Sequence, residues 1–159
     1  MPHHRASNTR TASRVFRRRR SIAGLDVDYI LINGGPILLA TAVGLAISAC
    51  YRALNRDRGT ARHLAPGWLL VITAVAEFWI ASILAGALIL APQQAAPWVM
   101  ALGSAVVIWI GFVVPTSIVG EAFRGVPLWR AGLDCALWLV VMVAQAAVLH
   151  GMGLVKPHP

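Results

Sequence analysis

The chain has 159 residues, of which 58% are hydrophobic and 13% charged, and its mean hydropathy is +0.69. Soluble domains average about 45–50% apolar and about 25% charged residues. This composition excludes an ordinary soluble enzyme and an intrinsically disordered chain, and the length suits a single domain.

The formal net charge of +8 comes from one end of the chain. Seven of the 14 basic residues precede residue 21, in a polar segment, 1–28, which we predict to be a basic disordered tail. Nucleic-acid-binding proteins instead spread their basic residues over a folded surface. The pattern therefore argues against nucleic acid as a partner, and it favours contact between the run Arg17–Arg20 and anionic lipid headgroups.

Four apolar runs follow the tail and predict helices at about 29–51, 67–90, 97–120 and 132–154. An α-helix of about 20 apolar residues crosses the hydrocarbon core of a bilayer. Since lipid offers no partner to backbone polar groups, runs of this length should be helical, and they are too long for barrel strands. We therefore predict an all-α, polytopic membrane protein whose four transmembrane helices form a bundle over 29–154, followed by a short tail, 155–159.

The orientation in the membrane is nearly balanced. With the N-terminus inside, eight basic residues flank the inner side and six the outer, whereas the loops without the tail favour an outside N-terminus. Two hypotheses stay open: residues 1–21 are not translated, or the tail is real and binds anionic lipid.

Glu77 is the strongest single candidate for a functional residue. It is the eleventh residue of the run 67–90, so it should lie near the bilayer centre. A charged side chain there costs about 2.5–3.5 kcal/mol on insertion scales, so it normally faces the bundle interior. Thr73, one turn earlier, shares its face. The carboxyl group is either a proton-linked site in a small transporter or a packing group hydrogen-bonded to Thr73, Thr116 or Gln145.

Other polar residues of the apolar runs are few. Gln145 should lie near mid-membrane, where an interhelical amide bond contributes roughly 0.6–2 kcal/mol. His150 should lie near an interface, where a lipid-headgroup contact is expected rather than a metal. Stripes of small residues, such as Ala40, Gly44 and Ser48, favour close helix packing or a homodimer.

The positions of the tryptophan and cysteine residues predict which of these side chains lie at the membrane interface and which are buried. Trp68, Trp98 and Trp129 lie at run ends, as expected for membrane interfaces. We expect the mid-run residues Trp79 and Trp109 to pack between helices. The two cysteines, Cys50 and Cys135, are expected to be buried thiols.

No catalytic or metal-binding motif accompanies these residues. The chain has no GxxxxGK[ST], GxSxG or HExxH sequence and no Cys/His cluster. We therefore expect no enzyme activity, no cofactor and no metal.

The stretches Trp109-Ile110-Gly111-Phe112, Phe123-Arg124-Gly125 and Trp129-Arg130, followed by Asp134 and Trp138, resemble the domain-of-unknown-function 1761 family. The similarity covers about 105–152 well and 29–90 only in outline. It implies a small four-helix protein of a bacterial cytoplasmic membrane, and it implies no reaction.

Together these patterns predict a multi-pass integral membrane protein with a structural or accessory role. The alternative is a small proton-coupled transporter that uses Glu77 as its membrane-embedded carboxylate, with Thr73 and Gln145 beside it.

Overall fold

The computed structural model describes residues 29–54, 67–92 and 96–156. Its regular elements are all helices, in the order α2 (Gly34–Leu54), α3 (Gly67–Leu90), α4 (Pro97–Ile108), η2 (Trp109–Val113), α5 (Val114–Phe123) and α6 (Leu128–Met152). The predicted all-α fold is confirmed for this part of the chain. The tail 1–28, with its Arg17–Arg20 run, lies outside the described residues.

Within the described residues, four segments are long and apolar enough to cross a membrane: Gly34–Leu54, Gly67–Leu90, Pro97–Phe123 and Leu128–Met152. The last one begins four residues before the sequence-based estimate and ends two residues before it. Residues 29–32 are also helical, but a turn at Asn33 separates them from α2. This break suits Pro36, which lacks a backbone N–H and is tolerated in the first turn of a helix.

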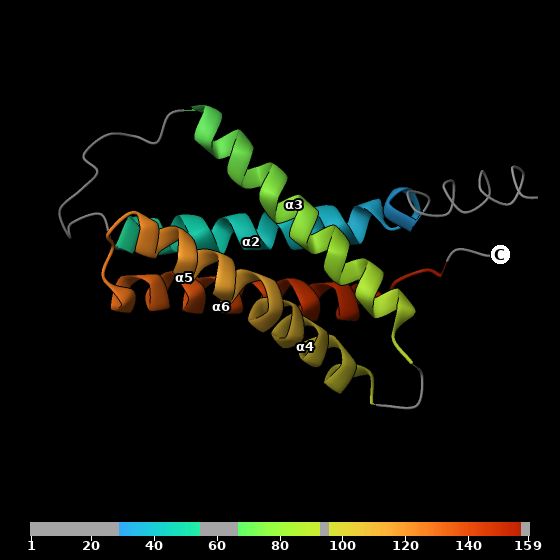
Figure 1. Ribbon diagram of the computed structural model, residues 1–159. Coiled ribbons are helices and arrows are strands. Elements are labelled where there is room, and N and C mark those ends of the chain that lie inside the picture. Colours follow the sequence, from blue (N-terminus) through green and yellow to red (C-terminus); the bar gives the residue numbers. More distant parts are fainter. Residues whose placement is uncertain (1–28, 55–66, 93–95, 157–159) are drawn as a thin grey trace, which may run out of the picture.

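Helices α2 and α6 lie side by side and α3 crosses them obliquely, while α4 and α5 lie along the other side of α6 (Figure 1). The buried core is built largely from small and aliphatic side chains where these helices meet. Its members are Ile37, Ala40, Ala81, Leu84, Ala85, Ala105, Met142, Ala146 and Leu149. Small residues at the crossings let the backbones approach closely, which is the main source of helix association in lipid.

Two hydrogen bonds join the first and the last parts of the membrane domain. Asn33 Nδ2 donates to the carbonyl of Val155 at 3.0 Å, and the Val155 N–H donates to Asn33 Oδ1 at 2.8 Å. The start of α2 therefore lies beside the segment that follows α6.

The third apolar segment is irregular and weakly buried. The N–H of Val114 bonds to the carbonyl of Trp109, which makes a π-helical turn of residues 109–113. Pro115 follows and has no N–H to donate, so the sequence places a helix-disrupting residue beside this turn. Only Ala101 and Ala105 of α4 are buried, and no residue of η2 or α5 is.

Large apolar side chains cover the outside of the bundle, including Val75, Trp79, Val107 and Phe112, each at least 62% exposed. A water-soluble monomer rarely shows such a continuous apolar surface. The arrangement is that of a bundle whose outer faces contact lipid.

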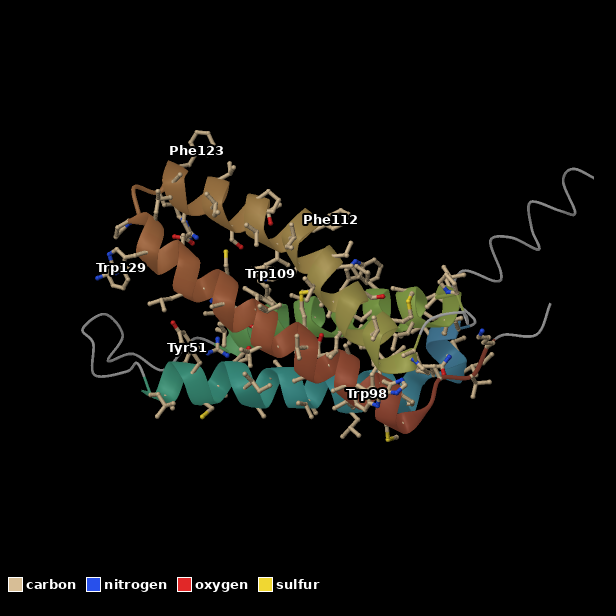
Figure 2. All side chains as sticks on the ribbon, turned by 90° about the horizontal axis from the view of Figure 1, so that it is seen from below. Tyr51, Trp98, Trp109, Phe112, Phe123 and Trp129 are labelled. Atoms are coloured by element: carbon tan, nitrogen blue, oxygen red, sulfur yellow. The ribbon has the colours of Figure 1, made fainter. Side chains whose placement is uncertain are left out.

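The positions of the aromatic and sulfur side chains correct two expectations. Trp79 does not pack between helices, because it is 62% exposed on the outer face of α3. Trp109 does pack inward, and its indole N–H donates to the carbonyl of Cys135 at 2.7 Å (Figure 2). Cys135 is buried as expected, but Cys50 is exposed.

The bond from Trp109 should hold the third segment against α6. We expect Trp109→Phe to lower the free energy of unfolding by about 0.5–1.5 kcal/mol, because the indole donor is lost and the Cys135 carbonyl is left without it. Thermal unfolding in detergent micelles measures this, with Trp79→Phe as the matched control. Equal effects of the two substitutions would contradict this role.

Candidate functional site

Glu77 lies in the interior of the bundle. It is on α3, its exposed fraction is 0%, and it faces α2 and α6. The packing face of α3 carries Ala81, Leu84 and Ala85, one and two turns further along, which are also fully buried. The helix register that buries these apolar residues therefore carries Glu77 inward with them.

Two neutral side chains hold the carboxyl group of Glu77. Ser48 Oγ, on α2, donates to Glu77 Oε1 at 3.0 Å. Gln145 Nε2, on α6, donates to Glu77 Oε2 at 2.8 Å and to the Glu77 backbone carbonyl at 3.4 Å. We call Ser48, Glu77 and Gln145 the polar clamp, because these bonds join three helices at one level.

Gly44 makes room for the polar clamp. A Cβ atom at this position would lie 2.7 Å from Gln145 Nε2 and 3.0 Å from Glu77 Cδ, and closer still to Glu77 Oε2. Real Cβ atoms essentially never approach other heavy atoms below 3.0 Å. Gly44 is one turn before Ser48, so a single face of α2 supplies both the space for the carboxyl group and a donor to it.

One atom of the polar clamp is left without a partner. Gln145 Oε1 is buried and accepts no hydrogen bond in the structure. A buried acceptor without a donor costs roughly 1–3 kcal/mol. Turning the amide over would not remove this cost, because Nε2 would then lose its bonds to the Oε2 and backbone oxygen of Glu77.

No basic group neutralises the carboxylate by direct contact within the described residues. The one salt bridge found there joins Arg124 to Glu121, at the far end of α5. The Glu77 carboxyl group is therefore held by hydrogen bonds from neutral donors. Both of its oxygens accept, and a neutral carboxylic acid fits only if its O–H donates to the Ser48 hydroxyl oxygen instead.

The structure brings two of the three predicted site residues into contact. Glu77 and Gln145 meet, but Thr73 does not join them, because its hydroxyl donates to the Leu69 carbonyl of its own helix at 2.8 Å. Thr116 likewise donates to carbonyls of its own helix, at Phe112 and Val113. Hydroxyl groups in helices often bond to the carbonyl one turn back in this way.

Ser48 is the partner that sequence reasoning missed. The signal was present, since Ser48 ends the stripe Ala40–Gly44–Ser48, of which Ala40 and Gly44 are buried. A stripe of small residues does not by itself distinguish a serine that only fills space from one that donates a hydrogen bond.

Cavities border the helices of the polar clamp, and one of them is lined by Ala76 and Ile80, which lie on either side of Glu77 in α3. Cavities of about 500, 460 and 300 Å³ occur along the contacts of α3 with α4, α5 and α6, and Glu77 lines none of the three. The second is largely apolar, with Thr116 and Ser117 as its polar lining residues. No group of three or more His, Cys, Asp or Glu side chains that could hold a metal occurs in the described part.

Comparisons with known proteins give no relative. No family model, no curated protein and no solved structure matches this chain. The geometry of the bundle is therefore the main guide to what the protein does.

Close packing at Gly44 should be essential to the polar clamp. We expect Gly44→Ala to lower the free energy of unfolding by about 1–3 kcal/mol, the usual cost of overpacking. The matched control is Gly35→Ala on the same helix, where a Cβ would meet nothing within 4 Å. Thermal unfolding of both variants in the same detergent measures this, and an unchanged melting temperature for Gly44→Ala would rule out the tight contact.

Proposed function

We propose that this chain is a small multi-pass integral membrane protein with a structural or accessory role, and that it is not an enzyme. The observation that carries the proposal is the enclosure of Glu77. The most unusual residue of the bundle is fully buried, is bonded to two other helices and lines none of the three cavities described above. A carboxyl group used in this way stabilises a helix arrangement.

Localisation to a bacterial cytoplasmic membrane, and membership of the domain-of-unknown-function 1761 family, belong to the same proposal. They rest on the similarity of residues 105–152 to that family. The four apolar helices support a multi-pass membrane protein in general.

A small proton-coupled transporter is the second candidate function. The observation in its favour is the unpartnered Oε1 of Gln145, which lies on the side chain that binds Glu77. A buried acceptor next to an acid is one element of a proton path. The structural role is favoured because a transporter also needs access from a cavity to the carboxyl group.

If the role is structural, the stability of the bundle should depend on the hydrogen bonds of the polar clamp and not on a charge at Glu77. Glu77→Gln can keep both bonds of the polar clamp, because its amide oxygen accepts from Gln145 and its amide N–H can donate to the Ser48 hydroxyl. We expect this variant to unfold within about 1 kcal/mol of the wild type. Gln145→Leu removes the donor to Glu77 and should lower the free energy of unfolding by about 1–3 kcal/mol.

Thermal and denaturant unfolding in detergent measure both variants. The reverse ranking, with Glu77→Gln the more damaging of the two, would contradict a clamp that works through hydrogen bonds.

A flux assay separates the two candidate functions. Purified protein is reconstituted into liposomes that contain a pH-sensitive dye, and an external acid pulse is applied. We expect the wild type and Glu77→Gln to show the same proton permeability as each other. A proton flux that is present in the wild type and absent in Glu77→Gln would overturn the structural role and support transport.

A further inference from the structure

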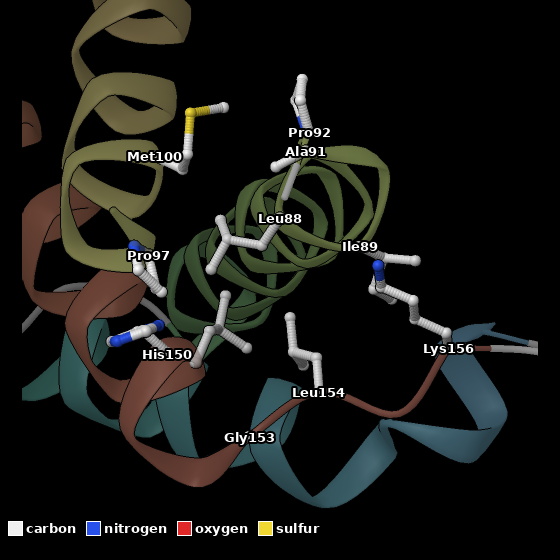
Figure 3. Close-up of a pocket in the computed structure, with 11 residues that line it drawn as sticks. Leu88, Ile89, Ala91, Pro92, Pro97, Met100, His150, Gly153, Leu154 and Lys156 are labelled. Atoms are coloured by element: carbon white, nitrogen blue, oxygen red, sulfur yellow. The ribbon is translucent and has the colours of Figure 1, made fainter. Parts of the chain in front are cut away.

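The cavity of about 500 Å³ lies at one end of the bundle, away from the polar clamp (Figure 3). Here α3 ends, α4 begins and α6 ends. Trp98 lies beside it in the first turn of α4, and tryptophan is enriched at the membrane–water interface. The cavity is therefore expected at the level of lipid headgroups.

Its lining combines an apolar floor with two nitrogen-bearing side chains. Leu88 and Leu154 lie between the helix ends (Figure 3), and Leu149 and Met100 also line the cavity. His150 and Lys156 lie on opposite sides of these leucines (Figure 3). A cavity of this kind suits a molecule that is apolar at one end and anionic at the other.

The His150 side chain and the backbone before Lys156 are held in place by contacts of their own. The His150 ring packs edge-on against Trp98, with 4.3 Å between ring centroids and 66° between the ring planes. Gly153, with a φ of 73°, ends α6 and turns the chain, and Val155 is then fixed by its two hydrogen bonds to Asn33. Lys156 is the next residue, so its backbone is anchored at the edge of the cavity.

The charge at the cavity is not balanced by acidic groups of the described bundle. Of the three acidic residues in that part, Glu77 is enclosed in the polar clamp, and Glu121 and Asp134 flank the turn between α5 and α6, at the other end of α6. The start of α4 carries a partial positive charge and the ends of α3 and α6 carry partial negative charges, so the attraction for an anion comes from Lys156.

We propose that this cavity binds an anionic membrane phospholipid, with the phosphate group at Lys156 and an acyl chain against the leucine floor. The lipid would fill the gap between the ends of α3, α4 and α6 and so stabilise the bundle from that side. The proposal is independent of the role of Glu77.

The test measures thermal unfolding of the purified full-length protein in a neutral detergent while phosphatidylglycerol or phosphatidylcholine is added. We expect phosphatidylglycerol to raise the melting temperature of the wild type by several degrees and phosphatidylcholine to have a much smaller effect. In Lys156→Gln the phosphatidylglycerol concentration needed for half of the shift should rise about fivefold, the usual effect of one basic residue near anionic lipid.

Two further variants keep the result specific. Arg130→Gln removes one positive charge near the start of α6, whereas the cavity lies at the end of this helix. Arg130 lies over the Trp129 ring there, so its loss should leave the response to phosphatidylglycerol unchanged. Ala91→Phe narrows the cavity without changing its charge and should weaken the response to phosphatidylglycerol.

Three outcomes would overturn the proposal. The first is an equal phosphatidylglycerol response in the wild type and Lys156→Gln, which would place the lipid elsewhere. The second is an equal response to both lipids, which would show that the charge is not recognised. The third is a shift of the same size with inorganic phosphate alone, which would make the cavity a site for a free anion.

Discussion

A carboxyl group in the middle of an apolar bundle must find hydrogen-bond partners, and this requirement governs how three of the helices meet. Lipid cannot solvate Glu77, so Ser48 and Gln145 must reach it from two neighbouring helices. The bonds have short range and defined geometry, so a shift of one helix by a single turn would break them. Apolar packing alone tolerates such shifts more easily, which makes the polar clamp the element that specifies the register.

The third membrane segment, Pro97–Phe123, is attached to the bundle in a different way. It makes no bond to the polar clamp, and its attachment depends on alanines at the crossing with α6 and on the indole of Trp109. The π-helical turn beside Pro115 gives this segment a local defect at mid-length. The bundle therefore consists of a specified three-helix unit and a more loosely held segment, and the cavities occur where the two parts meet.

Much of this architecture follows from hydropathy, because apolar runs of sufficient length can only be helices in lipid. Glu77 and Gln145 were also predictable, since polar groups at mid-membrane must face inward and meet. The outer position of Trp79 follows from the same constraint, because a residue two positions from Glu77 lies on the opposite face of the helix, and mid-run position alone did not reveal it. The sequence could not show whether Thr73 contacts Glu77. The Thr73 hydroxyl donates to a carbonyl of its own helix, so its place on the same face as Glu77 creates no hydrogen bond between them.

The two hydrogen bonds between Asn33 and Val155 join residues that are 122 positions apart. A ribosome makes Asn33 before any of the four long helices and makes Val155 after all of them. The bonds can form only when the last helix has entered the membrane and turned back beside the first. Closure of this end of the bundle therefore has to wait for the last helix, whatever the order in which the other helices pack.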